Sequence, residues 1–142
     1  MRLRRAGRAA RGPLNADVRR RMAKQRFQIP PERKRQFDLI EAASQAMLTW
    51  AHANGTSLEH IYPVVPFVET DFSLDAWLFV DTEVRIQQFQ SDGTVGILET
   101  QLRTELAKVG YPDSWLRLVA CHFGSKEVVD RDYEGNYYNF LR

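Results

Sequence analysis

At 142 residues, with 27% charged and 44% hydrophobic side chains, the chain is long enough for one domain whose core needs neither a disulfide nor a metal ion. Its single cysteine cannot form an internal disulfide, which is typical of a reducing compartment. No apolar run approaches the roughly 18 residues of a membrane-spanning helix, and no apolar segment of a secretory signal follows the basic start. The sequence therefore predicts a soluble, cytoplasmic protein with no membrane partner.

The formal net charge of +2 conceals a division between the two ends of the chain. Residues 1–35 carry thirteen Lys/Arg and two acidic residues, net +11, whereas residues 36–142 carry seven and sixteen, net −9. The first part contains too few large apolar side chains to offset the entropy lost on ordering. We therefore expect a basic tail over residues 1–26, disordered or a frayed helix over residues 1–21, and a single acidic domain over residues 27–142.

Three interpretations of the basic tail remain open. It could bind nucleic acid, because clustered arginines neutralise phosphates and release counterions. It could be an organellar presequence, which is also rich in arginine and poor in acid. It could also lie upstream of the true start at Met22, and the chain would then hold twelve basic and seventeen acidic residues, net −5. The arginines that the nucleic-acid interpretation would use are Arg4, Arg5, Arg8, Arg11, Arg19, Arg20 and Arg21.

The longest predicted helix begins at the proline pair of residues 30–31, because proline is favoured in the first helical turn. Apolar residues then recur at steps of three and four, and Gly55 is a suitable left-handed cap. Residues 56–59 resemble a capping box and predict a short turn of helix. Residues 64–68 predict a strand, in which Pro66 indicates an edge or a bulge because it cannot donate a hydrogen bond.

Residues 72–81 are apolar on both alternating faces and predict the central strand of a sheet. The side chains divide into Leu74, Ala76, Leu78 and Val80 on one face and Trp77 and Phe79 on the other. Residues 82–91 fit either an alternating strand or a capped short helix, and we favour the helix. After the break at Gly93, residues 95–109 predict an amphipathic helix that Gly110 ends.

The remaining elements follow in quick succession. Residues 115–123 predict a second apolar strand, residues 126–132 a short helix or an irregular arm, and residues 136–142 a last, aromatic strand. This order predicts an α+β fold, in which two main helices pack on one face of a small, mostly antiparallel sheet of about four strands.

The C-terminal run FGSKEVVDRDYEGNYYNFLR resembles the endings of small uncharacterised bacterial proteins, some of which look like immunity proteins encoded beside toxins. The resemblance covers about the last 30 residues and is not tied to a defined motif. It transfers no catalytic residue. It implies a bacterial protein that works by binding.

Several carboxylates invite a metal or acid–base interpretation. Asp130, Asp132 and Glu134 begin like a calcium loop, but its twelfth position, which needs a bidentate Glu, is Leu141. We therefore favour a solvated acidic turn. A second group crowds the two ends of the central strand, which are on the order of 30 Å apart and too distant to share an ion. This group consists of Glu69, Asp71, Asp75, Asp81 and Glu83, and we expect it to form a negative surface patch.

The neighbours Cys121 and His122 suggest a nucleophile and its base, but adjacent side chains of a strand face opposite sides of the sheet. We therefore expect a buried, inert thiol. The three histidines, which include His52 and His60, lack a metal-binding spacing. The sequence also has no phosphate loop, hydrolase elbow or dinucleotide fingerprint. No catalytic residue, metal or cofactor is predicted.

The leading hypothesis is a non-enzymatic protein that binds another macromolecule, as an immunity- or antitoxin-like inhibitor does. Its acidic domain suits a basic protein partner, such as a toxin or nuclease domain, because opposite charges speed encounter and fix orientation. Tyrosine would supply an apolar anchor. The predicted contact residues are Glu69, Asp71, Asp81, Asp130, Asp132 and Glu134, with Tyr137 or Tyr138 as the anchor.

Two alternatives remain. The chain could be a nucleic-acid-associated protein that binds only through its arginine-rich tail, which predicts binding that weakens with salt and disappears without residues 1–21. It could also be an enzyme that uses the carboxylates or His122.

Overall fold

The computed structural model describes residues 15–17, 19 and 29–142, and the chain divides into two compact units, residues 1–30 and 31–142. In the first unit, Ala16, Asp17 and Arg19 are helical and exposed, and the backbone N–H of Arg19 donates to the carbonyl of Asn15 at 3.0 Å. The rest of the predicted tail over residues 1–26 lies outside the described residues. So do six of its candidate arginines, Arg4, Arg5, Arg8, Arg11, Arg20 and Arg21.

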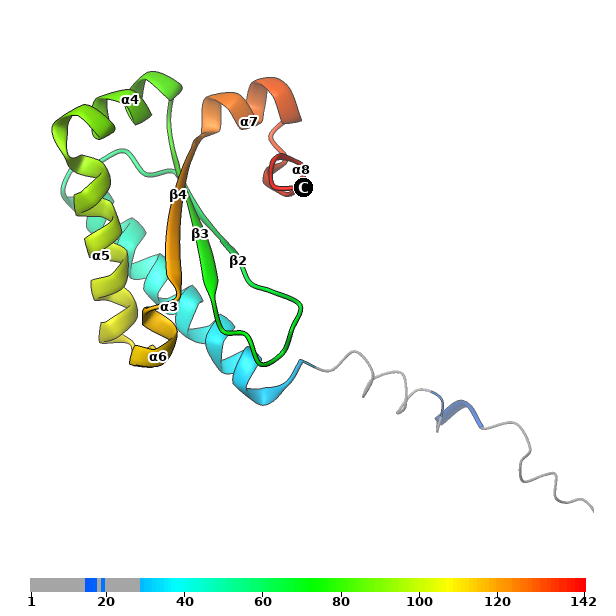
Figure 1. Cartoon of the computed structure of the whole chain (residues 1–142). Coiled ribbons are helices and arrows are strands. Elements are labelled where there is room, and N and C mark those ends of the chain that lie inside the picture. Colours follow the sequence, from blue (N-terminus) through cyan, green and yellow to red (C-terminus); the bar gives the residue numbers. More distant parts are fainter. Residues whose placement is uncertain (1–14, 18, 20–28) are drawn as a thin grey trace, which may run out of the picture. The chain divides into compact units, whose positions relative to one another are not determined.

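The second unit has an α+β fold, as the sequence predicts (Figure 1). In chain order its elements are α3 (Pro31–Ala53), β2 (His60–Val64), β3 (Leu74–Val80), α4 (Glu83–Asp92), α5 (Thr94–Lys108), α6 (Asp113–Leu116), β4 (Val119–Ser125), α7 (Lys126–Tyr133) and α8 (Tyr137–Phe140). No helix within the described part of the chain combines the length and apolarity needed to cross a bilayer.

The sheet has three strands in the order β2-β3-β4, with β3 antiparallel to β2 and parallel to β4. The prediction of about four mostly antiparallel strands is therefore wrong. The parallel pairing arises because α4, α5 and α6 carry the chain from the end of β3 back to its beginning, so that β4 starts at the same edge of the sheet as β3. The central position predicted for residues 72–81 is confirmed by β3.

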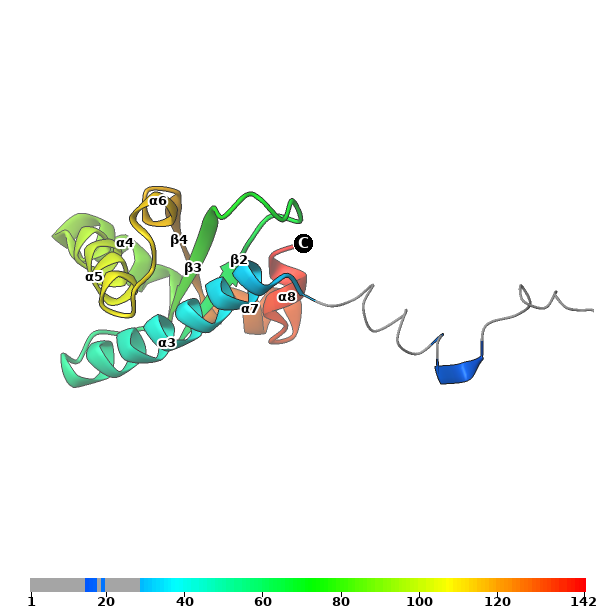
Figure 2. The same cartoon turned by 90° about the horizontal axis from the view of Figure 1, so that it is seen from below.

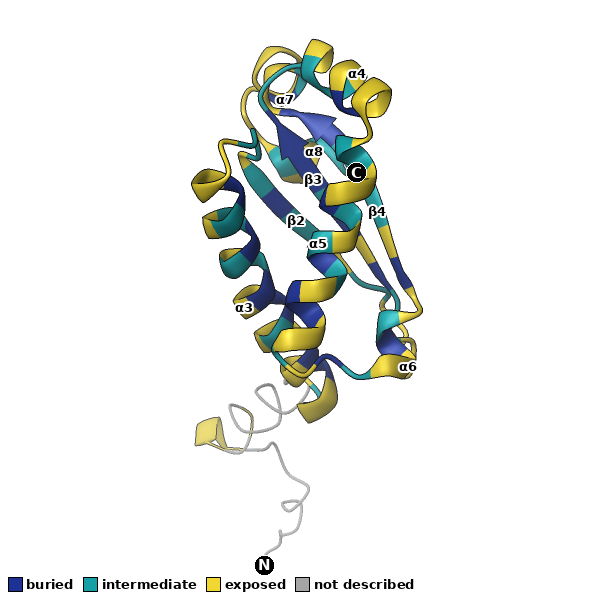
Figure 3. Cartoon of the chain, turned by 90° about the vertical axis from the view of Figure 1, so that its left-hand side faces the viewer, coloured by how far each residue is buried: buried dark blue, intermediate teal, exposed yellow. Residues whose placement is uncertain are grey.

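The core lies between one face of the sheet and the helices α3 and α5 (Figure 3). The three- and four-residue spacing of apolar side chains puts Met47 of α3 and Leu102 of α5 on the inner sides of their helices. These side chains meet Leu74, Ala76 and Leu78 of β3, all of which are buried. The predicted layer of two main helices on one face of the sheet is therefore present.

Residues 82–91 are helical, as favoured from the sequence. The hydroxyl of Thr82 accepts a hydrogen bond from the backbone N–H of Arg85 at 3.1 Å and caps the first turn of α4. The helix ends at Gly93, whose φ of 84° is left-handed. A glycine takes this conformation without strain, and α5 follows immediately.

Two predicted elements at the start of the sheet are wrong. Residues 56–59 contain no helical turn, and the first strand covers His60–Val64 rather than residues 64–68. Residues 65–73 form a loop instead, because the carbonyls of Pro66 and Val68 accept hydrogen bonds from the Arg33 side chain rather than from a neighbouring strand. A long-range contact of this kind has no local sequence signal.

The predicted last strand is also wrong, since α8 is a short helix. Glu134 and Gly135 are both left-handed, with φ of 53° and 78°, and turn the chain after α7. The side chain of Asn136 then accepts from the backbone N–H of Asn139 at 3.0 Å and caps α8. The strand predicted over residues 115–123 begins later, because the chain first forms α6.

Candidate functional site

The face of the sheet that turns away from α3 and α5 consists of three rows of side chains. The register of the strands gives the rows as His60–Phe79–Gly124, Tyr62–Trp77–His122 and Val64–Asp75–Ala120. The α7–α8 arm lies on the opposite side of the strands from α5 (Figures 1 and 2). The arm covers the first row and reaches the second row through Phe140, which meets the edge of Trp77, as the ring contacts of α8 show.

Aromatic packing closes the first row. The ring of Tyr137 lies 4.5 Å from His60 and 4.7 Å from Phe79, and the ring of Phe140 lies 5.4 Å from Phe79. Phe79 is fully buried as a result. Burial lowers the pKa of His60 and raises the pKa of Tyr137, because each loses hydration of its charged form. A Cβ at Gly124 would lie only 2.7 Å from the Phe79 ring, so this close packing requires glycine.

The other two rows form a partly exposed surface that we call the open face. Its members are Tyr62, Val64, Asp75, Trp77, Ala120 and His122. The Trp77 ring stacks on His122, with centroids 4.9 Å apart and planes at 25°, and Phe140 meets its edge at 5.5 Å. His122 Nε2 lies 2.8 Å from Asp75 Oδ1, and 54% of the Asp75 side chain is exposed. This site has no local signal in the sequence, because only the parallel pairing of β3 with β4 brings His122 next to Asp75 and Trp77.

The loop between β2 and β3 borders the open face and is held from the helical side. Arg33 of α3 is only 6% exposed, and its Nη2 donates to the carbonyls of Pro66, Val68 and Asp71 at 3.2, 2.8 and 2.9 Å. Its other terminal nitrogen donates to Gln36 Oε1. Three carbonyls on one guanidinium fix the direction of the loop backbone.

A second polar side chain secures the end of the same loop. Gln36 is fully buried, and its Nε2 donates to the carbonyl of Phe72 at 3.1 Å and to the hydroxyl of Tyr111 at 3.0 Å. With the backbone held at both ends, the side chain of Phe67 is 104% exposed and Val68 is also exposed. A phenylalanine fully in water on a tethered loop is the largest apolar group that this unit offers to a partner.

The structure separates the predicted acidic contact residues into two groups at opposite ends of β3. Glu69 and Asp71 lie in the loop before β3 and beside the open face. Asp81 follows the last residue of β3, and its carbonyl accepts from the backbone N–H at the start of α7, which bears the others. This second group consists of Asp81, Asp130, Asp132 and Glu134. One continuous acidic surface formed by all six residues is therefore not present.

The second group is also largely neutralised by its own cations. Asp81 accepts two hydrogen bonds from Arg85, both at 3.1 Å, and these bonds lower the pKa of Asp81. Asp130 is 2.6 Å from Lys126 Nζ, and Asp132 is 3.0 Å from Arg131, which lowers the pKa of Asp132. By contrast, the pKa of Asp71 is lowered chiefly by the Ser73 hydroxyl, an uncharged partner at 2.6 Å. The negative charge next to the open face is thus less compensated.

The two candidate tyrosines lie in different surroundings. Tyr137 packs against His60 and Phe79, whereas Tyr138 is exposed. Both belong to a helix rather than to the strand predicted over residues 136–142. Tyr138 is the one that remains available to a partner.

The region that resembles a calcium loop is helical over its first four residues, so Asp130 and Asp132 lie on α7 and Glu134 caps the end of that helix. No group of three or more His, Cys, Asp or Glu that could hold a metal occurs in residues 15–17, 19 and 29–142. A shallow depression of about 320 Å³ is lined instead by Asp132, Tyr133, Glu134, Asn136 and Asn139.

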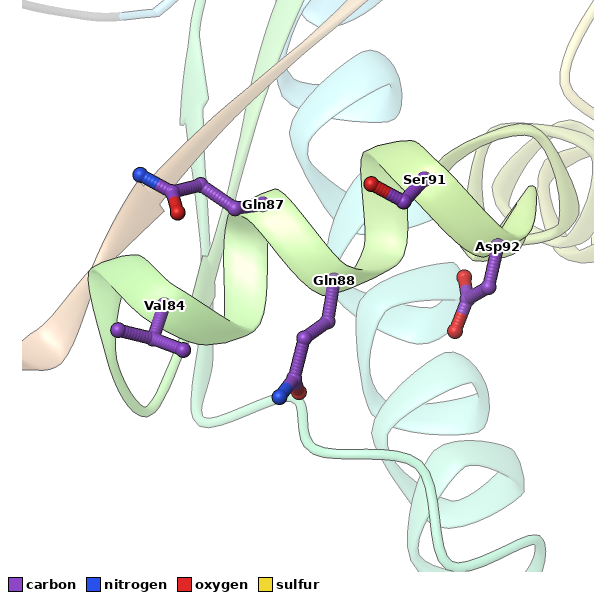
Figure 4. A pocket seen from close by; sticks show the side chains of 5 residues that line it. All are labelled: Val84, Gln87, Gln88, Ser91 and Asp92. Atoms are coloured by element: carbon purple, nitrogen blue, oxygen red, sulfur yellow. The ribbon is translucent and has the colours of Figure 1, made fainter.

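A second depression, of about 480 Å³, lies along α4 (Figure 4). Its lining comes from this one helix and consists of Val84, Gln87, Gln88, Ser91 and Asp92. The Asp92 carboxylate already accepts from the backbone N–H of Thr94 at 2.9 Å. No nucleophile and base converge in this depression.

Cys121 lies on the helix-covered face, opposite to His122. Burial raises its pKa to about 11. The thiol is therefore protonated at neutral pH and a poor nucleophile. This geometry agrees with an inert cysteine.

Comparisons with known proteins give no match to a family model, to a curated protein or to a solved structure.

Proposed function

We propose that the protein is a non-enzymatic protein that binds a basic protein partner, as an immunity- or antitoxin-like inhibitor does. The observation that carries this proposal is the open face, where two of the three rows of a sheet surface are left partly exposed and the α7–α8 arm touches them through Phe140 at the edge of Trp77. An aromatic surface rimmed by polar groups is typical of a protein interface, because it gains free energy when a partner removes it from water.

The charge around the open face selects the class of partner. Residues 31–142 contain ten Lys/Arg and seventeen Asp/Glu, net −7. Glu69 and Asp71 lie in the adjoining loop, and Asp75 lies on the face itself. A basic surface would complement this potential, which raises the rate of encounter and disfavours acidic competitors.

The loop between β2 and β3 provides an anchor. Phe67 is exposed on a backbone that Arg33 and Gln36 hold in place, so little conformational entropy is lost when the ring enters a pocket of a partner. Large anchors of this kind supply a major share of binding free energy. The paired carboxylates at the other end of β3, together with Tyr138, contribute to the general field or to the edge of the interface.

The proposal is tested by capture of partners from the source cell with the full chain as bait, followed by identification and a binding titration with the purified partner. We expect a protein of positive net charge whose affinity falls with salt. Phe67→Ala should weaken binding at least about tenfold, as expected for an anchor. Ile97→Ala, which truncates another exposed apolar residue on α5, is the matched control and should bind like the wild type.

Two outcomes contradict the proposal. One is a partner of negative net charge, and the other is a Phe67→Ala variant that binds as tightly as Ile97→Ala. Loss of all binding on removal of residues 1–21, together with recovery of nucleic acid, would favour the alternative that relies on the arginine-rich tail.

A further inference from the structure

Trp77 is held in a fixed orientation at the centre of the open face. It belongs to the middle strand, with Tyr62 and His122 beside it in the neighbouring strands. The His122 ring stacks on it at 4.9 Å, and Phe140 supports its edge at 5.5 Å with planes at 83°. An indole that is immobilised but still partly exposed can bind a flat ligand with little loss of side-chain entropy.

A carboxylate with spare hydrogen-bonding capacity lies next to this ring. Asp75 is two residues before Trp77 on the same face, which separates their Cα atoms by about 7 Å. Oδ1 of Asp75 is engaged by His122 at 2.8 Å. In the part of the chain that the structure describes, Oδ2 receives no hydrogen bond. A group bound over the indole can therefore reach an unused anionic acceptor.

Two other aromatic rings of the same unit already hold a guanidinium. Arg33 lies over the Phe72 ring at 5.1 Å, and Arg35 lies over the Trp115 ring at 5.4 Å. Within residues 15–17, 19 and 29–142, no arginine or lysine lies over Trp77, whose stacked neighbours are His122 at 4.9 Å and Phe79 at 6.2 Å. The exposed remainder of the indole, next to Asp75, therefore suits a guanidinium that the described residues do not supply.

Arginine fits this site better than lysine does. A guanidinium is planar, so it can stack on an indole while its N–H groups donate sideways to a carboxylate. An ammonium is a compact, strongly hydrated charge that gains less from stacking. A nucleobase could also stack on Trp77, but its phosphates would be repelled by Asp75, Glu69 and Asp71.

We infer that the open face is an arginine-binding site for the partner, with the guanidinium stacked on Trp77 and hydrogen-bonded to Asp75 Oδ2. The inference rests on the proposed function and names the side chain that the partner supplies. Val64 and Phe67 would contact apolar residues that flank this arginine, because Val64 is exposed on the face and Phe67 is exposed on the adjoining loop.

The site is tested with a blocked Gly-Arg-Gly peptide as the probe, titrated into isotopically labelled full-length protein and followed by NMR. The indole N–H of Trp77 is assigned with a Trp77→Phe variant. We expect the arginine peptide to shift this signal and the amides of Ala120 and His122. The citrulline peptide has the same shape but no charge and should cause no shift, and the lysine peptide should bind more weakly.

Two variants with the same change of charge separate a local contact from the general field. Asp75→Asn should lower the affinity for the arginine peptide at least about threefold, as expected for an exposed charge pair. Asp38→Asn removes a carboxylate from α3, which packs on the other face of the sheet, and should leave the affinity unchanged. Equal weakening by both variants, equal binding of citrulline and arginine, or tighter binding of a thymidine octamer would each overturn the inference.

The results also distinguish this inference from the proposed function. If partner binding depends on Phe67 but the arginine peptide does not shift the Trp77 signal, the proposed function is supported and the arginine site is contradicted. If the peptide binds at Trp77 but no basic partner is found, the arginine site is supported and the proposed function is contradicted.

Discussion

The two faces of the sheet are formed by alternate residues of the same strands, yet only one face is closed. Leu78 is fully buried beneath α3 and α5, whereas the preceding residue, Trp77, remains partly exposed. Both side chains are large and apolar, so apolarity does not decide which of them leaves water. The covering element decides, and on the second face the α7–α8 arm buries one row and reaches the next row only at the edge of Trp77.

The largest expected difference in stability is between variants of the neighbours Leu78 and Trp77. Leu78→Ala should lower the free energy of unfolding by about 3 kcal/mol, because it deletes buried methyl groups and leaves a cavity. Trp77→Ala removes more atoms but should lower it by only about 1.5 kcal/mol, since part of the ring already faces water. Urea unfolding of both variants measures the difference. Equal losses would mean that the second face is as closed as the first.

The next effect concerns the loop that borders the open face. Arg33→Met leaves three backbone carbonyls without their donor and should lower the free energy of unfolding by about 2 kcal/mol. Hydrogen exchange of residues 66–72 should also accelerate. Arg35→Met is the matched control, because Arg35 is exposed and its contacts with the described residues are a 3.7 Å ion pair and a ring contact. The loss of stability should therefore stay below about 1 kcal/mol. An unchanged exchange rate in Arg33→Met would show that the loop is held by other contacts.

A smaller effect is expected where the covered and open rows meet. Gly124→Ala would put a methyl group 2.7 Å from the Phe79 ring and 3.4 Å from Phe140, and the strain should cost about 1 to 2 kcal/mol. Gly96→Ala has open space within 4 Å and lies inside α5, so it should stabilise by about 0.5 to 1 kcal/mol. Thermal unfolding of the pair provides the test. Two changes of the same sign would contradict the close packing of the first row.

The smallest effect belongs to the ion pairs at the other end of β3. The hydrogen bonds from Arg85 lower the pKa of Asp81 below its value of 3.8, so the pair stabilises the fold above that pH and the contribution is lost as the pH falls through the native pKa. Because 36% of Asp81 and 41% of Arg85 are exposed, solvent screening keeps this contribution below about 0.5 kcal/mol.

Asp81→Asn measures this contribution. Below pH 4 the acid-induced loss of stability should be slightly smaller in the variant, and at pH 7 the variant should be weaker by no more than that amount. A large loss at pH 7 would show that the end of β3 is less solvated than the open face, which reverses the comparison.

The parts of the fold that the sequence predicts correctly have local causes. The helices α3 and α5 follow from apolar spacing, α4 from its threonine cap, and β3 from its alternating apolar faces. The errors have distant causes. The β2–β3 loop replaces a strand because a side chain on α3 takes its carbonyls, and α8 replaces a strand because a cap and two left-handed residues stop the chain from extending.

The candidate site shows the same limit more strongly. The sequence indicates an acidic domain, but counting carboxylates cannot tell that Asp81 is paired with Arg85 while one oxygen of Asp75 has no hydrogen-bond donor among the described residues. Phe67 has no local signal, because its exposure depends on Arg33 on another element. Trp77 and His122 become neighbours only because β3 pairs with β4, and 38 residues lie between the end of β3 at Val80 and the start of β4 at Val119.

This separation along the chain also sets the order in which the strands can pair during synthesis. β2 and β3 are joined by a short loop and can pair early, but β4 reaches β3 only after α4, α5 and α6 have been synthesised. The ring of His122 that steadies Trp77 is therefore added late, and the ring of Phe140 later still. A chain still emerging from the ribosome presents the tryptophan without these supports, so the proposed binding surface is complete only after the parallel pairing and α8 have formed.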